Sequence, residues 1–206
     1  MARLVVCISR AAGAGGEEIA KLVADQLAFR LVDDEIVRRA AEIAGVSEEQ
    51  VAQAEHSKPL VARIMEALAT VPSVSEGGYI AATALPSPGV AYSHLIERVV
   101  RETAESERVV IVAHGASHAL GGRPEVLRVF VTASPKTRAE RLSREQGLDE
   151  KAAAKSVAAS DKERARYLER FYDVNQELPV QYDLTLNTDL VTPATAAQLV
   201  VVAAKA

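Results

Sequence analysis

The sequence has a single cysteine, Cys7, and no long apolar run. One cysteine excludes a disulfide framework and a cysteine-rich zinc site. No segment approaches the roughly 18–20 uninterrupted apolar residues that cross a bilayer. The apolar start of the chain is too short for a secretory signal, and it runs into Arg10 and glycines rather than a cleavage site. We therefore expect a cytoplasmic protein with no membrane partner.

An excess of positive charge is also absent. The chain has 24 Lys and Arg residues against 28 Asp and Glu residues, which gives a net charge of −4. Because a duplex-binding protein needs a basic surface to displace counterions, we expect no nucleic-acid partner. A content of 49 % hydrophobic residues excludes disorder as the dominant state. A length of 206 residues fits one domain, or one domain with a smaller inserted lobe.

Buried strands and amphipathic helices alternate along the chain. The apolar, β-branched runs that predict strands are Leu4–Ser9, Phe29–Val32, Val109–Ala113, Leu127–Thr132 and Leu184–Asn187. Helical periodicity covers Glu17–Ala28, Asp34–Ala44 and a charge-dense helix pair over Lys136–Tyr172, broken near Gly147. Strands without polar alternation are buried on both faces. This order predicts a three-layer α/β fold, with a doubly wound, parallel, five-stranded sheet between helices.

The turn after the first expected strand is rich in glycine. It reads Ser9-Arg10-Ala11-Ala12-Gly13-Ala14-Gly15-Gly16-Glu17 and leads into the first helix. Glycine lets the backbone approach a ligand and adopt a positive φ, and a helix N-terminus attracts anions. The segment therefore predicts a phosphate-binding loop. The alternative is a tight strand–helix turn that binds nothing.

The loop departs from the standard phosphate-loop pattern, Gly-x-x-x-x-Gly-Lys-Ser/Thr. With Gly15 as the second glycine, Gly16 occupies the lysine position and Glu17 that of the metal-binding hydroxyl, while Arg10 replaces the first glycine. The charge of a bound phosphate must then be neutralised by another group. Arg10 is the nearest candidate.

The string Ile8-Ser9-Arg10, followed by Gly13-Ala14-Gly15-Gly16, resembles the opening of the cytidylate kinase-like family, whose loop commonly reads Ser-Arg-x-x-Gly-Ser-Gly-Gly. Further stretches of the family pattern follow in order: Val32–Ile36, Leu127–Val131 with Arg138 and Arg141, Asp161–Arg164 with Tyr167, and Tyr182–Thr188. The resemblance implies a P-loop kinase-like domain over residues 1–206. Within it we expect a helical acceptor-binding insert at 45–107 and a lid-like helical segment at 134–172.

This resemblance implies a nucleotide-binding phosphotransferase of the nucleoside monophosphate kinase type, with ATP as donor, Mg²⁺ as metal and a small-molecule acceptor. The expected donor site comprises Gly13, Ala14, Gly15, Gly16 and Glu17, with Asn187 and Thr188 near the base. Phosphoryl transfer needs positioned charge rather than a protein nucleophile. Because the loop lysine is missing, a catalytically weak or inactive nucleotide sensor is the alternative. A purely structural oligomer is a third.

Arginines of the expected lid are the candidate catalytic cations. Arg138 and Arg141 lie three residues apart and share a helix face, and Asp161 and Arg164 repeat that spacing. The family places such arginines over the transferring phosphoryl group, and the guanidinium fork suits phosphate. We expect Arg141 and Arg164 to act in catalysis with Arg10, and Arg138 and Asp161 to bind substrate. The alternative is a solvated helix pair with ion pairs to nearby glutamates.

The acceptor is expected near Asp34, His114 and Arg123. At Asp34 a carboxylate either orients the acceptor or caps the next helix. His114 stands where the family usually has an arginine, and a mostly neutral histidine should bind phosphate more weakly, so Arg123 is the candidate for restoring that charge. His114 and His118 are four residues apart, but no nearby Asp, Glu or Cys completes a metal site.

The expected insert carries two further signals. The stretch from Ser47 to Gln50 has the form of a capping box that opens a helix. An apolar stripe follows, formed by Val61, Ile64, Met65 and Leu68. The stripe belongs either to the core or to the seam of a homodimer.

Overall fold

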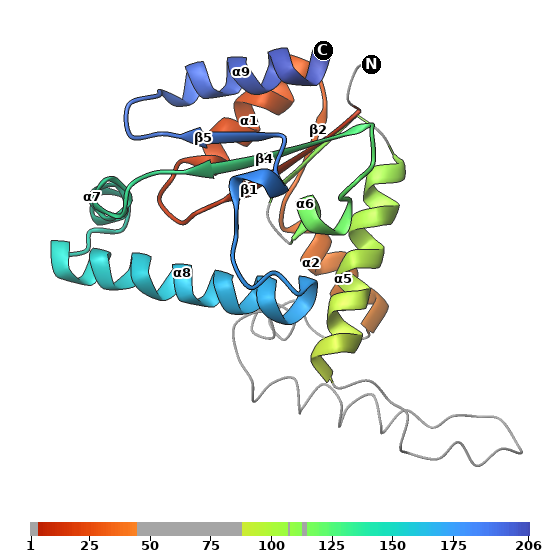
Figure 1. Cartoon of the computed structure of the whole chain (residues 1–206), viewed down its shortest axis with the longest axis horizontal. Helices are drawn as coiled ribbons and strands as arrows, with labels where there is room; N and C mark the ends of the chain where they lie inside the picture. Colours follow the sequence, from red (N-terminus) through yellow and green to blue (C-terminus); the bar gives the residue numbers. More distant parts are fainter. Residues whose placement is uncertain (1–3, 45–87, 107, 113–114) are drawn as a thin grey trace, which may run out of the picture. The chain divides into compact units, whose positions relative to one another are not determined.

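The computed structural model describes residues 4–44, 88–106, 108–112 and 115–206 (Figure 1). The chain divides into two compact units, Met1–Asp33 with Val100–Ala206, and Asp34–Val99. The strands are β1 (Val5–Arg10), β2 (Arg30–Val32), β3 (Val109–Val112), β4 (Val126–Thr132) and β5 (Leu184–Asn187). The helices are α1 (Gly16–Leu27), α2 (Glu35–Ala44), α5 (Pro88–Glu105), α6 (Ala116–Ala119), α7 (Pro135–Gln146), α8 (Glu150–Tyr172) and α9 (Pro193–Lys205), with a 3-10 turn η1 at Pro179–Gln181.

The five strands form one parallel sheet in the order β2-β3-β1-β4-β5. The expected fold class is confirmed, and each observed strand differs from its predicted range by at most one residue at either end. Strand β1 lies at the centre, with Val5 paired to Val109 on one side and to Val126 on the other. The chain therefore leaves the middle of the sheet at Arg10, where ligands of open α/β sheets commonly bind.

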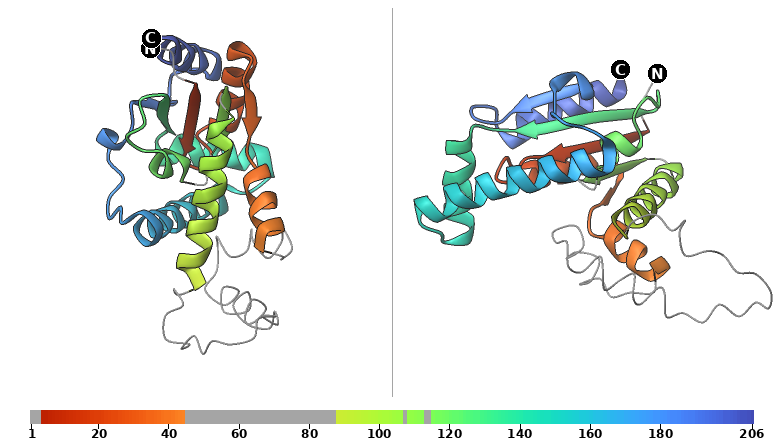
Figure 2. Two further views of the ribbon diagram at one scale, coloured as in Figure 1. Left: turned by 90° about the vertical axis from the view of Figure 1, so that its right-hand side faces the viewer. Right: turned by 60° about the horizontal axis from the view of Figure 1, so that its bottom comes forward.

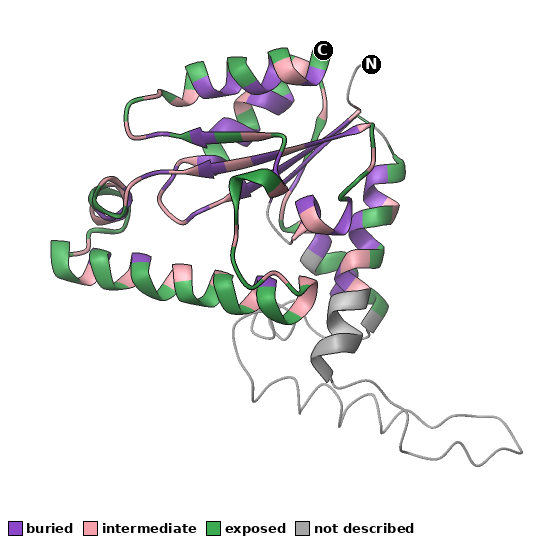
Figure 3. Cartoon of the chain, in the orientation of Figure 1, coloured by how far each residue is buried: buried purple, intermediate pink, exposed green. Residues whose placement is uncertain are grey.

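Helices α1 and α9 cover one face of the sheet, and α8 lies on the opposite side (Figures 1 and 2). Alternate β1 residues Val6 and Ile8 pack with Ile19 of α1 and Val200 of α9 in the main apolar core. Figure 3 shows the central strands as almost continuously buried. Cys7 is fully buried, and burial raises the pKa of its thiol to about 12, so it is an inert packing residue.

The charge-dense helix pair forms with its predicted break. Gly147, with φ 67°, follows the last residue of α7 as its C-cap, and Asp149 caps α8 by accepting a hydrogen bond from the Ala152 N–H. A small apolar cluster holds the two helices together and consists of Ala139, Leu142, Ala153 and Val157. This cluster is separate from the main core, so few apolar contacts stabilise the pair.

Several predictions for the insert lie outside the described residues. These are the capping box at Ser47 and the apolar stripe from Val61 to Leu68. His114, which is predicted to lie near the acceptor, is also outside the described residues. Helix α5 falls within the expected insert and buries Ile96 and Val99 at helical spacing. In the ranges that the structure describes, no helix combines the length and apolarity needed to cross a membrane.

Candidate active site

The glycine-rich loop connects the carboxyl end of β1 to α1. Its turn requires left-handed backbone, since Gly13 has φ 74° and Gly15 has φ 78°. Gly15 is the N-cap of α1 and provides no side-chain cap. The first N–H groups of a helix have no intrahelical partner, so this end of α1 offers donors and a positive dipole end to an anion.

Two loop glycines are also required by close packing. A Cβ at Gly13 would lie 2.6 Å from the carbonyl oxygen of Arg138, and a Cβ at Gly16 would lie 2.6 Å from the Cβ of Arg10. Gly16 therefore leaves room for the Arg10 side chain at the position where other phosphate loops carry lysine. A lysine here would displace the arginine.

Arg10 extends along the start of α1 and forms an ion pair with Glu17, with Nη2 and Oε1 2.8 Å apart. Its Nε is buried without a hydrogen-bond partner among the described residues. The Arg10 side chain as a whole is 26 % exposed. The structure thus brings the predicted substitute for lysine to the phosphate loop, together with a carboxylate that offsets part of its charge.

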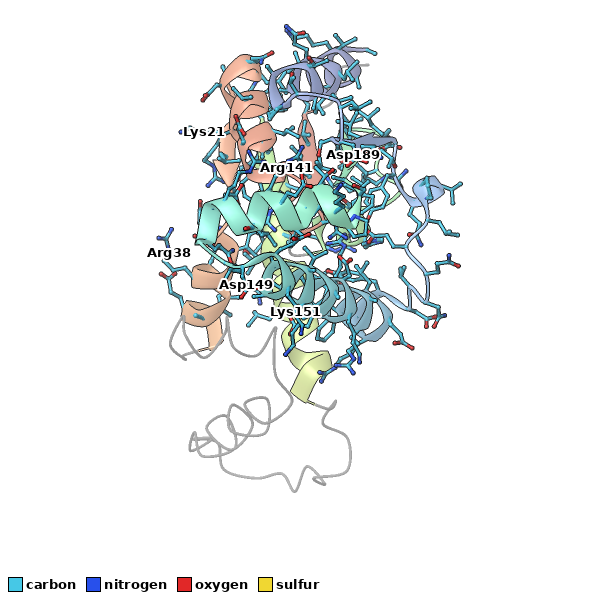
Figure 4. All side chains as sticks on the ribbon, turned by 90° about the vertical axis from the view of Figure 1, so that its left-hand side faces the viewer. Lys21, Arg38, Arg141, Asp149, Lys151 and Asp189 are labelled. Carbon is cyan, nitrogen blue, oxygen red and sulfur yellow. The ribbon has the colours of Figure 1, made fainter. Side chains whose placement is uncertain are left out.

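Arg141 of α7 and Thr188, which follows β5, bind carbonyls of the loop. Thr188 Oγ1 donates to the Ala14 carbonyl at 2.9 Å, and Arg141 donates to Thr188 Oγ1 at 2.8 Å and to the Thr188 carbonyl at 2.6 Å. Arg141 Nη1 also lies 3.4 Å from the Gly13 carbonyl. Figure 4 shows Arg141 where α7 approaches the sheet. The C=O and the following N–H of a trans peptide point in opposite directions, so holding the Ala14 carbonyl turns the Gly15 N–H the other way.

Arg138 and Asp161, which the sequence predicts to bind substrate, form an ion pair with each other. The two side chains form a bidentate ion pair, with Nη1–Oδ1 at 2.7 Å and Nη2–Oδ2 at 2.6 Å. Arg138 is buried, and it also donates to the Ala133 carbonyl at 3.1 Å and to the Ala12 carbonyl at 3.4 Å. This arginine of α7 is therefore bonded both to the loop and to α8. The partner is Asp161, whereas the sequence suggested neighbouring glutamates.

Arg164 lies beside the loop in a polar cluster. Its Nε and Nη2 donate to Glu177 at 2.8 and 2.6 Å, and its Nη1 is 3.5 Å from the Arg10 carbonyl. Tyr182 donates its hydroxyl hydrogen to Glu177 and lies 3.4 Å from Arg164 Nη2. A cavity of about 370 Å³ opens here, within the size range of small-molecule sites. Its lining includes Ala11, Thr132, Arg138, Asp161, Arg164 and Glu177.

Three further predicted site residues lie outside the glycine-rich loop. Arg123 precedes β4 at the amino edge of the sheet, opposite the loop, and pairs with Glu125 at 2.6 Å. Asp34 belongs to the unit Asp34–Val99 and is exposed before α2. Asn187 ends β5, where its side chain accepts a hydrogen bond from the Asp189 N–H at 2.8 Å.

Sequence reasoning missed Glu177 as a site residue and gave Tyr182 no chemical role. Glu177 lies in the connection between α8 and η1, where no periodicity indicates which way a side chain points. Burial alone would raise the pKa of the Glu177 carboxyl, but hydrogen bonding and charge from Arg164 outweigh burial and lower it. Glu177 is therefore ionised at neutral pH.

The described geometry defines a P-loop kinase-like protein: a parallel sheet with a glycine loop between its central strand and first helix, and arginine-bearing helices above that loop. A family model for the cytidylate kinase-like family matches residues 5–190. The chain belongs to the cytidylate kinase-like family. No curated protein matches the chain.

Solved structures agree on the fold. An uncharacterized protein from Eubacterium ventriosum matches with a TM-score of 0.68 at 19 % identity, over 98 % of both chains. A shikimate kinase from Bacteroides thetaiotaomicron matches with a TM-score of 0.53 at 17 % identity, over 96 % of both chains. A protein from Thermus thermophilus matches with a TM-score of 0.54 at 16 % identity, over 99 % of this chain and 98 % of its own. At these identities the likeness concerns the fold alone.

Proposed function

We propose that the protein is a phosphotransferase of the nucleotide kinase type, with ATP as phosphoryl donor and a small molecule, such as a nucleoside monophosphate, as acceptor. The observation that carries this proposal is the anchoring of the loop. Four of its carbonyls, those of Arg10, Ala12, Gly13 and Ala14, lie within 3.5 Å of donors from Arg138, Arg141, Arg164 or Thr188. This arrangement favours a preorganised backbone whose amides bind phosphate oxygens.

The chain's own groups suit a reaction driven by positioning and charge. Loop amides hold the phosphates, and Arg10 supplies the positive charge that a loop lysine would otherwise provide. Arg164 Nη1 faces the start of the loop and can bind a phosphoryl oxygen. Bound Mg²⁺ would neutralise phosphate charge, and its ligands would come mainly from phosphate and water, because Glu17 is already paired with Arg10. No protein nucleophile is required.

A nucleotide-binding sensor with little or no turnover is the second candidate. It is favoured by the Arg10–Glu17 pair, which lowers the net positive charge at the loop while Gly16 fills the lysine position. The sensor and the kinase share the binding site and differ in the rate of phosphoryl transfer. Binding and turnover must therefore be measured separately.

The decisive experiment compares Gly15→Val with Gly122→Val. Both glycines have nearly equal φ, 78° and 80°, and both have open space around an added Cβ, so the backbone strain is matched. Gly122 lies before β4, away from the loop. Thermal-shift titration with ATP and Mg²⁺ should raise the Tm of wild type and Gly122→Val, but not that of Gly15→Val. Equal Tm shifts in all three proteins would place nucleotide binding elsewhere and contradict the proposal.

A turnover assay then separates the two candidates. ATP consumption that depends on an added nucleoside monophosphate supports the kinase. Saturable ATP binding without acceptor-dependent consumption supports the sensor. If wild type binds no nucleotide, both candidates fail and the fold has been retained for another purpose.

A further inference from the structure

We propose that Glu177 and Tyr182 are positioning residues that hold Arg164 with one edge of its guanidinium toward the phosphate loop. The inference rests on the proposed nucleotide site and adds to it two residues that never touch the nucleotide. It concerns how one lid arginine is oriented before a ligand arrives.

The contact pattern on Arg164 distinguishes its two edges. The Glu177 carboxylate accepts hydrogen bonds from one edge, with Nε–Oε2 at 2.8 Å and Nη2–Oε1 at 2.6 Å. The remaining nitrogen, Nη1, is directed to the Arg10 carbonyl at 3.5 Å, a distance too long for a strong hydrogen bond. A phosphoryl oxygen beside the loop would be a better acceptor for this nitrogen. The carboxylate therefore fixes the guanidinium plane without occupying the edge that faces the loop.

Glu177 is itself held in place. The Tyr182 hydroxyl donates to the same Glu177 oxygen, Oε1, that accepts from Arg164 Nη2. Tyr182 is buried, its ring stacks on Phe130 of β4 at 5.1 Å, and its hydroxyl is 3.3 Å from His118 Nε2. The Arg164 guanidinium lies over the same Phe130 ring, at 5.4 Å. Tyr182, which stacks on Phe130 of the sheet, thus holds the Glu177 carboxylate, and this carboxylate in turn holds Arg164.

This arrangement has a clear physical benefit. A free arginine side chain loses rotamer entropy when it is fixed on a ligand. An arginine that is already held in its binding orientation loses less, so it stabilises the terminal phosphate of the nucleotide more strongly. A competing interpretation is that the ion pair with Glu177 prevents Arg164 from binding phosphate. The two interpretations predict opposite effects when the carboxylate is neutralised.

The test uses the affinity of the full chain for ATP relative to ADP, which isolates the terminal phosphate and needs no turnover. We measure both dissociation constants by calorimetry for wild type, Glu177→Gln, Tyr182→Phe and Arg164→Ala. Glu169→Gln is the charge-matched control, since Glu169 is exposed on α8. We expect Arg164→Ala to reduce the preference for ATP about tenfold, which is the scale of one charge-assisted hydrogen bond. Glu177→Gln and Tyr182→Phe should reduce it several-fold, and Glu169→Gln should leave it unchanged.

A double variant shows whether Glu177 acts through Arg164. If it does, Glu177→Gln adds no further loss of ATP preference in the Arg164→Ala background. A purely structural role would lower Tm in both backgrounds without changing the ATP-to-ADP ratio, and that result would overturn the inference. An increased ATP preference in Glu177→Gln would overturn it in favour of the competing interpretation. If wild type binds neither nucleotide, the proposed function fails as well. If wild type prefers ATP and Glu177→Gln matches it, only the positioning role fails.

Discussion

Arg138 of α7 and Asp161 of α8 bind each other through two parallel hydrogen bonds of 2.7 and 2.6 Å. The exposure of the two side chains is unequal, with Arg138 at 5 % and Asp161 at 45 %. Asp161 therefore neutralises a buried cation while remaining partly hydrated itself. The pair joins α7 to α8 and, through the Ala12 carbonyl, to the glycine-rich loop.

Neutralising Asp161 should destabilise the fold. Asp161→Asn leaves the buried Arg138 guanidinium without its counter-charge, and we expect a loss of roughly 1–3 kcal/mol in the free energy of unfolding, less than for a fully buried pair. Urea denaturation measures the change. Glu140→Gln is the matched control, because its partner Lys136 lies 3.9 Å away on the exposed side of α7. That control should cost close to nothing. Equal small losses in both variants would contradict the structural role of Asp161.

Removing the Thr188 hydroxyl should loosen the loop. Thr188→Val keeps the side-chain shape but deletes the donor to the Ala14 carbonyl and the acceptor for Arg141. We expect a destabilisation of about 1–2 kcal/mol and weaker nucleotide binding. Thr185→Val, at an exposed position of the preceding strand β5, is the control, and it should be neutral or slightly stabilising because valine favours strands. If nucleotide affinity were unchanged in Thr188→Val, the hydrogen bond from Thr188 to the loop would not contribute to nucleotide binding.

A methyl group at Gly16 should displace Arg10. The added Cβ would lie 2.6 Å from the Arg10 Cβ and 2.8 Å from its Cδ, and the φ of Gly16 lies outside the left-handed region. Gly16→Ala therefore tests the Arg10 contact without backbone strain. We expect ATP affinity in Gly16→Ala to fall to the level of Arg10→Ala, and the double variant to add little. Additive losses in the double variant would show that Gly16 and Arg10 act independently.

The fold could be predicted because its strands carry the strongest local signal. The run Val109–Val112 is buried on both faces, so its apolar residues appear consecutively in the sequence. The phosphate loop could be predicted for a similar reason, since positive φ at Gly13 and Gly15 restricts the residue type locally. Both features depend on neighbouring residues alone.

The partners of the arginines could not be predicted. Helical spacing shows that Arg138 and Arg141 share a face, but it does not say which acceptors the folded chain brings to each. Arg138 binds an aspartate 23 positions away, and Arg141 binds a threonine 47 positions away. Glu177 reaches Arg164 from an irregular connection. Such contacts depend on tertiary structure, which a local pattern does not encode.

The stability contributed by Glu177 should depend on pH. Burial would raise the pKa of its carboxyl, but Arg164 lowers it below the ordinary value of 4.5. Because the folded-state pKa lies below the unfolded one, the contribution is fully present above about 4.5 and is lost as the pH falls through the folded value. Wild type should therefore be more stable than Glu177→Gln at neutral pH, and the difference should shrink in acid.

Urea denaturation of both proteins at several pH values provides the measurement. Glu169→Gln is again the control, and its stability difference from wild type should be small at every pH. A difference between wild type and Glu177→Gln that stays constant into acid would contradict the ion pair with Arg164 as its source.

The lid helices should exchange their amide hydrogens faster than the central strands. The apolar cluster that α7 and α8 share, around Leu142 and Val157, is small, whereas β1 and β4 lie in the main core. Segments with few buried apolar contacts open locally at lower free energy. We expect amides of α7 and α8 to exchange well before those of β1 in the protein without ligand, and to slow when ATP and Mg²⁺ are added. Helix α9, which packs in the main core, is the internal control and should not change. Protection of α7 and α8 equal to that of β1 before ligand is added would show that these helices are a fixed part of the core and do not close over a nucleotide.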